Sequence, residues 1–580
     1  MGDGLGSVTP GPGGNPRRVA KVRAALAARS GEFRSIGIRA RQAGLLAVVT
    51  GAVTGLAVAV FDRVVARGLY DRVLTAPLWV QAVVPGVGLA VAAVILRTVG
   101  HGTGSATTDA YIKAFHDPER RLELRPVPAR LLASAATLGS GGAMGFEGPS
   151  MYMGAAIGTW LQNRWSRAFS REDNKLLMVC GAAAGVAAIF KAPATGMVFA
   201  LEVPYRQDLA RRMLLPAMFA AASSYVVFVS LNGTAPLFPV GGVPPFDLRD
   251  LGGAAVLGLL AGLGARFVAR LFRTAKAFAA SRPAIVRIPL VASGLVVVFV
   301  AMRSLTGRSL SIGSGYLTID WVLQPNRAVW VIVGVFVLRM LATTLAIGGS
   351  GVGGLFVPLV VQGALLGGAL GAAVHAHDTS LFPLLGVAAF LGAGYRVPLA
   401  AVVFVAETTG RPGFVVPGLI AAAMSQLLMG QSSVSPYQEG ARSSLLERRL
   451  GLPVTAALRS DVATVPPDAS IAELFDHHIS QLRLRAVPVV DGAEYLGMIY
   501  LDDVASLPRA EWATTTVATV LRADAPSTVV GATLGAALQA METGDVDRLA
   551  VLDGTSFVGI VTTGEILKLD AILDRAEEIS

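Results

Sequence analysis

Long apolar runs with few charged residues fill most of the chain up to about residue 430. A run of about 20 apolar residues is long enough to cross a bilayer as a helix. Several runs are shorter than this or are interrupted by glycine and proline, a pattern tolerated at membrane depth where the free backbone groups are buried in protein or line a wet cavity. The pattern predicts a transport protein. Its apolar runs cover residues 43–61, 78–96, 131–145, 176–201, 214–231, 254–265, 290–302, 329–348, 355–374, 381–406 and 415–429.

Two stretches of this apolar region repeat each other. Gly145 stands four residues before Pro149, as Gly354 does before Pro358. Residues 193–202 also align without a gap on residues 398–407, each segment running from a proline to a glutamate. Paired broken segments in corresponding halves indicate a substrate site at the repeat interface, near the membrane midplane. Glycines then follow five and nine residues after each proline, at Gly154, Gly158, Gly363 and Gly367.

The pattern changes after about residue 438, where charges recur every few residues and short strand-like runs appear. This region is also duplicated. Asp491-Gly492 precedes Gly497 as Asp553-Gly554 precedes Gly559, and an acid follows six residues beyond each of those last glycines. The spacing predicts two βαβ-like modules. We therefore divide the chain into a mobile basic tail (1–35), a transmembrane domain (36–440) and two soluble modules (453–510 and 511–580).

Composition supports a polytopic α-helical membrane protein. Of 580 residues, 53% are hydrophobic and only 15% are charged, and the mean hydropathy is +0.59, which soluble proteins rarely reach. Cys180 is the single cysteine, which excludes a disulfide framework and a thiolate metal site. We predict no metal site at His375, His377 and Asp378, which lie in a short polar break between apolar runs.

Basic residues cluster before the first apolar run and after the last one, within a formal net charge of +10. The positive-inside rule then places both termini in the cytoplasm of a multi-pass protein of the cell membrane. No nucleic-acid-binding motif accompanies the basic residues, so we predict no nucleic-acid partner. The chain begins with no pattern typical of a cleaved signal peptide.

Glu147 is an ionisable residue inside an apolar region, a costly placement that marks a candidate functional site. The prolines at 149 and 358 suit the first turn of a helix. Two such helix starts facing each other offer free N–H groups and two positive dipole ends, which form an anion site. A carboxylate there competes with the anion for the same donors, and its protonation frees the site. The alternative is an acid that stabilises a helix N-terminus.

Together, these motifs resemble the CLC family of chloride channels and proton-coupled anion transporters. They are Gly145-Phe146-Glu147-Gly148-Pro149, Gly354-Leu355-Phe356-Val357-Pro358, the Phe190–Glu202 segment and the two soluble modules. The resemblance implies a voltage-gated type of channel or transporter, built as a homodimer of inverted repeats with broken helices, with Glu147 as the gate and chloride or a similar anion as substrate. It also implies that the backbone of Gly145, Phe146, Glu147, Gly354, Leu355 and Phe356 lines the anion path, with the hydroxyl of Tyr437.

The sequence departs from this family at two places. The first anion loop of the family has a serine and a proline, whereas this chain reads Gly100-His101-Gly102-Thr103-Gly104-Ser105. We assign Gly102 and Thr103 to the loop and leave open whether His101 or Thr103 takes the place of the serine. The second departure is Val203, where proton-coupled members generally have a glutamate.

Valine cannot carry a proton, so a passive channel is the first prediction and a chloride/H⁺ antiporter, in which Glu202 or another acid substitutes, is the alternative. For Glu202 and Glu407, which end matched apolar runs, we predict helix-end acids paired with nearby backbone or arginine.

The soluble modules resemble a tandem pair of cystathionine-β-synthase-type (CBS) domains. Such pairs often bind ATP or another adenine nucleotide, with an acid after the second strand holding the ribose hydroxyls. By resemblance, Asp503 and Glu565 take that place and Thr562 contacts phosphate or ribose. The alternative is a dimerisation module without a ligand. Nothing in the chain predicts an enzyme or a required cofactor.

Overall fold

The structure is a computed structural model that describes residues 41–117, 122–165, 175–238, 240, 246–376, 378–440, 450–480 and 486–569. These residues fall into two compact units, divided between residues 441 and 442. The first unit is helical, and the second combines strands and short helices. His377 and the basic tail lie outside the described residues.

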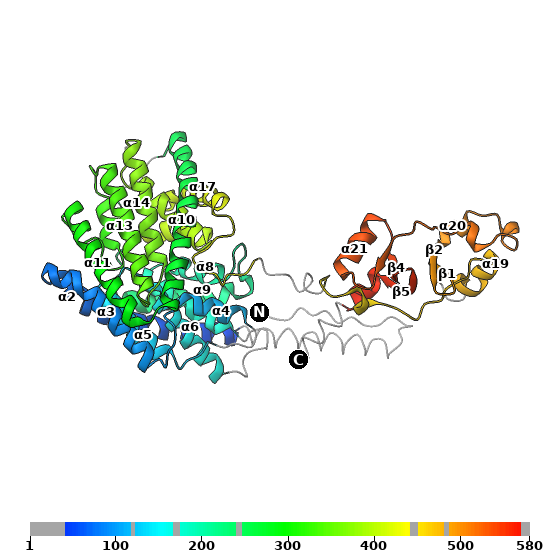
Figure 1. The fold of residues 1–580 in the computed structure, drawn as a ribbon, viewed down its shortest axis with the longest axis horizontal. Helices are drawn as coiled ribbons and strands as arrows, with labels where there is room; N and C mark the ends of the chain where they lie inside the picture. The colour runs from blue at the N-terminus through cyan, green and yellow to red at the C-terminus, as the bar shows by residue number, and fades with distance from the viewer. Residues whose placement is uncertain are drawn as a thin grey trace, which may run out of the picture. The chain divides into compact units, whose positions relative to one another are not determined.

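The first unit is a multi-pass helical domain (Figure 1). Eight of its described helices are long and apolar enough to cross a membrane, beginning with the span Arg41–Thr75, which includes η1 (Arg63–Tyr70) and α2 (Asp71–Thr75). The long helices α10 (Leu248–Ser281), α13 (Val329–Gly348) and α14 (Phe356–Ala373) pack side by side. The following elements are α3 (Leu78–Thr98), α4 (Thr108–His116), α5 (Val127–Gly139), α6 (Glu147–Arg164), α7 (Leu176–Phe190), α8 (Pro193–Glu202), η4 (Arg211–Met213), α9 (Leu214–Asn232), α10 (Leu248–Ser281), α11 (Ala284–Thr306), α12 (Tyr316–Val322), α13 (Val329–Gly348), α14 (Phe356–Ala373), α15 (Leu381–Gly394), α16 (Pro398–Thr409), η5 (Pro412–Phe414) and α17 (Val415–Met429).

Two apolar runs that the sequence presented as single segments are each two helices. The run 176–201 is α7 and α8, separated by Lys191 in a left-handed conformation (φ 53°). The run 381–406 is α15 and α16, and here Arg396 is left-handed (φ 57°). Each break stands two residues before the proline that starts the next helix, so the repeat extends to the backbone conformation.

Other boundaries from the sequence were also wrong. The run 131–145 is not one segment, because α5 ends at Gly139 and a loop leads to α6. The run 254–265 is the middle of the 34-residue helix α10. Helix α6 was missed as an apolar segment, although most of its side chains are buried inside the protein.

The matched glycines explain how the repeated helices pack. A Cβ on Gly154 of α6 would lie 2.0 Å from the carbonyl oxygen of Gly181 in α7. In the second repeat, a Cβ on Gly363 of α14 would lie 2.2 Å from the carbonyl oxygen of Gly386 in α15. Small residues let helix backbones approach this closely within a membrane. The α6–α7 and α14–α15 pairs are therefore equivalent units, and they hold the starts of α6 and α14 in place.

The second unit contains a five-stranded sheet in the order β1-β2-β5-β4-β3. The pairs β1–β2, β2–β5 and β5–β4 are antiparallel, and β3 pairs in parallel with β4. The segments that precede the two modules are exchanged. Arg459, before the first module's strands, bridges Ile560 in β5, and Arg522, before the second module's strands, bridges Met498 in β2. The elements are η6 (Val454–Ala457), α19 (Ile471–Glu473), η7 (Leu474–Ser480), β1 (Ala486–Asp491), β2 (Glu494–Tyr500), α20 (Leu501–Ala505), η8 (Arg509–Glu511), η9 (Val517–Thr519), β3 (Ser527–Val529), α21 (Leu534–Thr543), β4 (Arg548–Asp553) and β5 (Ser556–Thr562).

Candidate functional site

The loops that lead into α6 and α14 meet directly, as the repeat predicts. The Gly145 N–H donates to the Gly354 carbonyl oxygen at 2.9 Å, and the Gly354 N–H donates to the Gly145 carbonyl oxygen at 2.7 Å. This antiparallel pair joins the two repeats at equivalent residues. It also uses both glycine N–H groups, so they are not free donors for an anion.

The carboxylate of Glu147 folds back onto this glycine pair. The side chain is 1% exposed, and its Oε1 accepts a 2.7 Å hydrogen bond from the Phe356 N–H at the start of α14. A Cβ on Gly354 would lie 1.9 Å from Glu147 Oε1, and one on Gly145 would lie 1.8 Å from Oε2. Only glycine at these two positions leaves room for the carboxylate. Glu147 thus occupies the Phe356 N–H donor at the start of α14.

Tyr395, which follows α15, comes to the same place, and sequence reasoning missed it. Its side chain is 2% exposed. Its ring packs edge-to-face on Phe199, with centroids 5.6 Å apart. The signal available in the sequence was only a tyrosine between two apolar helices.

The first anion loop has a different register from the one expected. His101 and Gly102 are exposed, and the Thr103 hydroxyl faces Gly100. Instead, the Thr107 hydroxyl donates to the Gly353 carbonyl oxygen at 3.4 Å, and it would lie 2.6 Å from a Cβ on Gly148. The structure therefore brings Thr107, and neither His101 nor Thr103, beside the two helix starts.

Tyr437 is not brought to the Glu147 site by any described contact. Its side chain is 40% exposed, and the Lys113 ammonium lies 3.9 Å from the centre of its ring. The expected tyrosine thus has a cation partner at a more open location.

Glu202 and Glu407 cap each other's repeat. The Glu407 carboxylate accepts from the N–H groups of Ala194 and Thr195, at 2.9 and 2.7 Å, at the start of α8. The Glu202 carboxylate accepts from Leu399 and Ala400, at 3.2 and 2.9 Å, at the start of α16. The predicted pairing of helix-end acids with backbone is confirmed, although the backbone belongs to the opposite repeat. A carboxylate at a helix N-terminus is stabilised by the helix dipole.

Val203 lies fully buried beside this cap. Its carbonyl oxygen accepts a 2.8 Å hydrogen bond from the Gln438 side-chain amide, which also reaches the Tyr395 carbonyl oxygen at 2.7 Å. Both oxygens of Glu202 are engaged by the start of α16. Glu202 therefore serves as a cap at the point where the sequence had allowed it to replace a proton carrier.

Arg339 in α13 is a second buried charge that sequence reasoning missed, and its signal was a lone arginine within an apolar run. It is 1% exposed. Its guanidinium donates to the carbonyl oxygens of Leu310, Gly313 and Ser314, at 3.2, 3.1 and 2.9 Å. These contacts fix the loop before α12, in agreement with the rule that buried charges are hydrogen-bonded.

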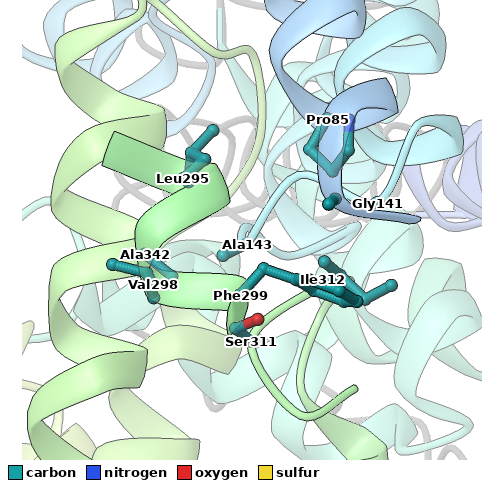
Figure 2. Close-up of a pocket in the computed structure, with 10 residues that line it drawn as sticks. Pro85, Gly141, Ala143, Leu295, Val298, Phe299, Ser311, Ile312 and Ala342 are labelled. Carbon is teal, nitrogen blue, oxygen red and sulfur yellow. The ribbon is translucent and has the colours of Figure 1, made fainter. Parts of the chain in front are cut away.

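A small cavity near this loop is not an anion site. Its volume is about 10 Å³, room for at most a single water molecule. Figure 2 shows its lining, in which Leu295, Val298 and Phe299 come from α11 and Ala342 from α13. The Ser311 hydroxyl is the polar side-chain group among the residues that line it. An anion needs several converging donors, and this cavity lacks them.

In the soluble unit, both candidate acids are paired with basic side chains. Asp503 receives two-pronged hydrogen bonds from Arg522, whose Nη2 lies 2.6 Å from Oδ1. These bonds raise the pKa of Arg522. Glu565 bonds to Lys568 at 3.0 Å, and its N–H donates to the Thr562 hydroxyl at 3.2 Å.

These pairings limit how the acids fit a nucleotide. The carboxylates have the chemistry to hold ribose hydroxyls, but a ribose at Asp503 must displace Arg522. The Arg522 guanidinium also lies 5.0 Å from the centre of the Tyr500 ring. It is half exposed and so has room to move.

Comparison with known sequences agrees with this geometry. Residues 87–430 match the profile of the voltage-gated chloride channel family, and residues 454–509 and 517–571 match the CBS domain. The H⁺/Cl⁻ exchange transporter ClcA of Yersinia pestis bv. Antiqua (strain Angola) is 27% identical over 432 residues, which cover 69% of this chain and 90% of the relative. ClcA of Citrobacter koseri is 30% identical over 320 residues, covering 53% of this chain and 67% of the relative.

Solved structures share the fold. A slow cyanobacterial Cl⁻/H⁺ antiporter has a TM-score of 0.59 at 21% identity, covering 67% of this chain and 94% of its own. A CLC-type fluoride/proton antiporter also reaches 0.59, at 22% identity, over 69% and 98%. A eukaryotic CLC transporter reaches 0.57 at 18% identity over 92% of this chain and 98% of its own. The relatives are transporters, and this chain is a multi-pass membrane protein that belongs to the voltage-gated chloride channel (CLC) family and carries two CBS domains.

Proposed function

We propose that this CLC-family anion transporter conducts chloride or a similar small anion passively, through a path that Glu147 closes. The observation that carries the proposal is the hydrogen bond between the Glu147 carboxylate and the Phe356 N–H. An anion that approaches the start of α14 must replace this carboxylate. Protonation of Glu147 removes its charge and releases the donor.

The passive mode is supported by Glu202 and Val203, the two buried residues at the end of α8. Coupled proton movement needs a titratable group on the inner part of the route, and Val203 offers none. Glu202 is held by two backbone N–H groups of α16, so it is not a free carrier.

A second candidate, a chloride/H⁺ exchanger, is favoured by the names of the relatives, which are exchange transporters. The two modes separate in proteoliposomes that hold a chloride gradient. We expect chloride efflux without uphill proton movement. When a potassium ionophore carries the compensating charge, this efflux should need no proton ionophore. Sustained proton uptake against its gradient, driven by chloride, would establish the exchanger.

We also propose a homodimer in a lipid bilayer with both termini in the cytoplasm. The basic clusters that flank the apolar region support this orientation. Large apolar side chains exposed on the spans, such as Trp79, Val226 and Leu427, suit contact with lipid or a second subunit. Light scattering of the detergent-purified protein and protease access from each side of the membrane test the two statements.

Binding of ATP or another adenine nucleotide to the CBS pair is a separate proposal. Its support is the chemistry of Asp503 and Glu565, which follow β2 and β5, and of Thr562 at the end of β5. Binding requires Arg522 to leave Asp503, so we expect weak affinity. Calorimetric titration of the full chain with ATP, ADP and AMP measures it, and no heat with any of them would leave the tail a module without this ligand.

A further inference from the structure

A second cavity, of about 500 Å³, lies at the end of α14 that is far from Glu147. Its walls come from the loop between α12 and α13, the first turn of α13, the last turns of α14 and the loop that leads to α15. Helices α13 and α14 pack against each other beside it (Figure 1). The volume falls in the range of pockets that hold small molecules, about 300–1,000 Å³. None of its lining residues contacts Glu147, so it is a separate site.

The lining of this cavity, which we call the α13–α14 pocket, is apolar on its helices and polar on its loops. The helix part consists of Val329 and Ile332 of α13 and Gly368, Gly371 and Ala372 of α14. Both helices are long and apolar enough to cross a membrane. The pocket lies where α13 begins and α14 ends, so it stands at the boundary between the hydrocarbon core and the headgroups of a bilayer.

Trp330 marks the same boundary. Its side chain is 68% exposed in the first turn of α13, and tryptophan is enriched at the interface between membrane and water. A molecule that fills the α13–α14 pocket therefore has its apolar part beside the helices and its polar part beside the loops. Such a molecule is amphiphilic, as are the lipids that surround a multi-pass protein.

The loop side of the pocket carries a positive charge that has no acidic partner among the described residues. The Arg327 Nη2 donates to the Gln324 side-chain oxygen at 2.6 Å, and the guanidinium carbon lies 4.9 Å from the centre of the Trp321 ring. In the described part of the chain, the buried Nε has no hydrogen-bond partner. A guanidinium matches the geometry of a phosphate. Arg327 therefore keeps donors for an anionic group.

Two further features favour a negative charge in the pocket. No described side chain caps the start of α13, so its positive dipole end lies uncapped beside the pocket at Ala328 and Val329. Asp378, the acid in the lining, is already used. Its Oδ1 accepts from the N–H groups of Ser380 and Leu381, at 2.7 and 3.1 Å. These bonds cap the start of α15 and reduce the repulsion that Asp378 exerts on an anion.

We propose that the α13–α14 pocket binds an anionic phospholipid, with the phosphate at Arg327 and the upper part of an acyl chain against α13 and α14. Basic pockets between membrane helices bind anionic headgroups. The pocket is smaller than a whole phospholipid, so the rest of the chains stays in the bilayer. The inference does not depend on the proposed passive transport. It gives α14 a lipid contact at one end and the Glu147 contact at the other.

The first test compares Arg327→Gln with the matched control Arg308→Gln, an exposed arginine outside the pocket, in the full chain. Native mass spectrometry of the detergent-purified protein measures the binding of anionic phosphatidylglycerol and of phosphatidylcholine, which has no net charge. We expect the wild type and Arg308→Gln to bind phosphatidylglycerol more tightly than phosphatidylcholine. Arg327→Gln should weaken phosphatidylglycerol binding on the order of fivefold, the effect of one basic residue near anionic lipid, and leave phosphatidylcholine binding unchanged.

A second pair of variants tests the location. Ala372→Trp fills the pocket from α14, whereas Ala373→Trp adds the same side chain at an exposed neighbour that does not line it. We expect Ala372→Trp to bind one phosphatidylglycerol fewer than the wild type, and Ala373→Trp to match the wild type. If Ala372→Trp does not fold, the comparison at Arg327 decides alone, because that partly exposed side chain is not needed for the core.

Several results would overturn the proposal. Equal binding of the two lipids by the wild type, or the same binding in Arg327→Gln and Arg308→Gln, removes the role of the charge. Displacement of phosphatidylglycerol by an equal concentration of inorganic phosphate shows that the pocket takes a free anion and not a lipid. A folded Ala372→Trp protein that binds like the wild type places the lipid elsewhere.

Discussion

The starts of α6 and α14 and the starts of α8 and α16 are both related by the internal repeat, yet they differ in chemistry. At α8 and α16 the interaction is duplicated, and each start is capped by a glutamate from the opposite repeat. At α6 and α14 the backbone pairing is duplicated, but one start supplies a carboxylate and the other supplies the donor. The difference indicates that symmetric contacts hold the repeats together, whereas the unsymmetric contact is the one that we propose as the gate.

Removal of the unsymmetric carboxylate should have the largest effect. Glu147→Ala frees the Phe356 N–H from a charge-assisted hydrogen bond worth about 1.5–3 kcal/mol. We expect anion flux to rise on the order of tenfold or more and to lose its dependence on pH. Proteoliposome efflux measures the rate, with Glu147→Gln as the isosteric control. Loss of flux in a folded Glu147→Ala protein would count against the gate.

Substitution of Gly354, which lies against the Glu147 carboxylate, should have the next largest effect. A Cβ in Gly354→Ala would lie 1.9 Å from Glu147 Oε1 and 2.7 Å from the Gly148 nitrogen. We expect the carboxylate to be expelled, so that flux rises, while crowding of the Gly148 backbone lowers stability by about 1–3 kcal/mol. Gly104→Ala is the control, because a Cβ there meets nothing within 4 Å. Equal behaviour of the two variants would refute the tight fit.

The symmetric caps should affect stability and not gating. Glu202→Ala and Glu407→Ala each leave two backbone N–H groups of a helix start without their acceptor, which costs about 1–2 kcal/mol. We expect similar falls in melting temperature for the two variants, with the ion preference of the wild type. A change of proton coupling in Glu202→Ala but not in Glu407→Ala would show that the two caps are not equivalent, and it would assign Glu202 to a proton route.

The smallest effect is expected in the soluble unit. Arg522→Ala removes an exposed ion pair, so the melting temperature and the basal anion flux should stay unchanged. Release of Asp503 should tighten adenine-nucleotide binding, because the ribose no longer competes with the guanidinium. Calorimetric titration with ATP checks this, and Arg548→Ala, which breaks a local pair with Asp547, serves as control. Identical ATP affinity in both variants would argue against ribose binding at Asp503.

Local spacing in the sequence was sufficient to predict the repeat and the meeting of Gly145 with Gly354. The role of Glu147 as a gate stays a prediction. The helix breaks at Lys191 and Arg396 were not predicted, because each is a single charged residue within a long apolar run and the left-handed backbone conformation is not visible in the sequence. Helix α6 was missed since it buries itself in protein and not in lipid, and so it needs less apolar sequence.

The side chains that complete the site were not predictable for a different reason. Tyr395 and Thr107 reach the site through the packing of helices distant in sequence, and Thr107 bonds to a residue 246 positions away. The family pattern directed attention to Tyr437, whose half-exposed ring contacts Lys113. The reciprocal caps likewise join residues about 200 positions apart.

The exchanged glutamates also have a consequence for synthesis at the ribosome. The cap of Ala194 is supplied by Glu407, 213 residues later. At 5–20 residues per second, translation leaves the start of α8 uncapped for roughly 10 to 40 s. During that interval the first half of the membrane domain holds a helix end whose donors have no protein acceptor. A chain that ends between the two halves therefore leaves the start of α8 without this acceptor.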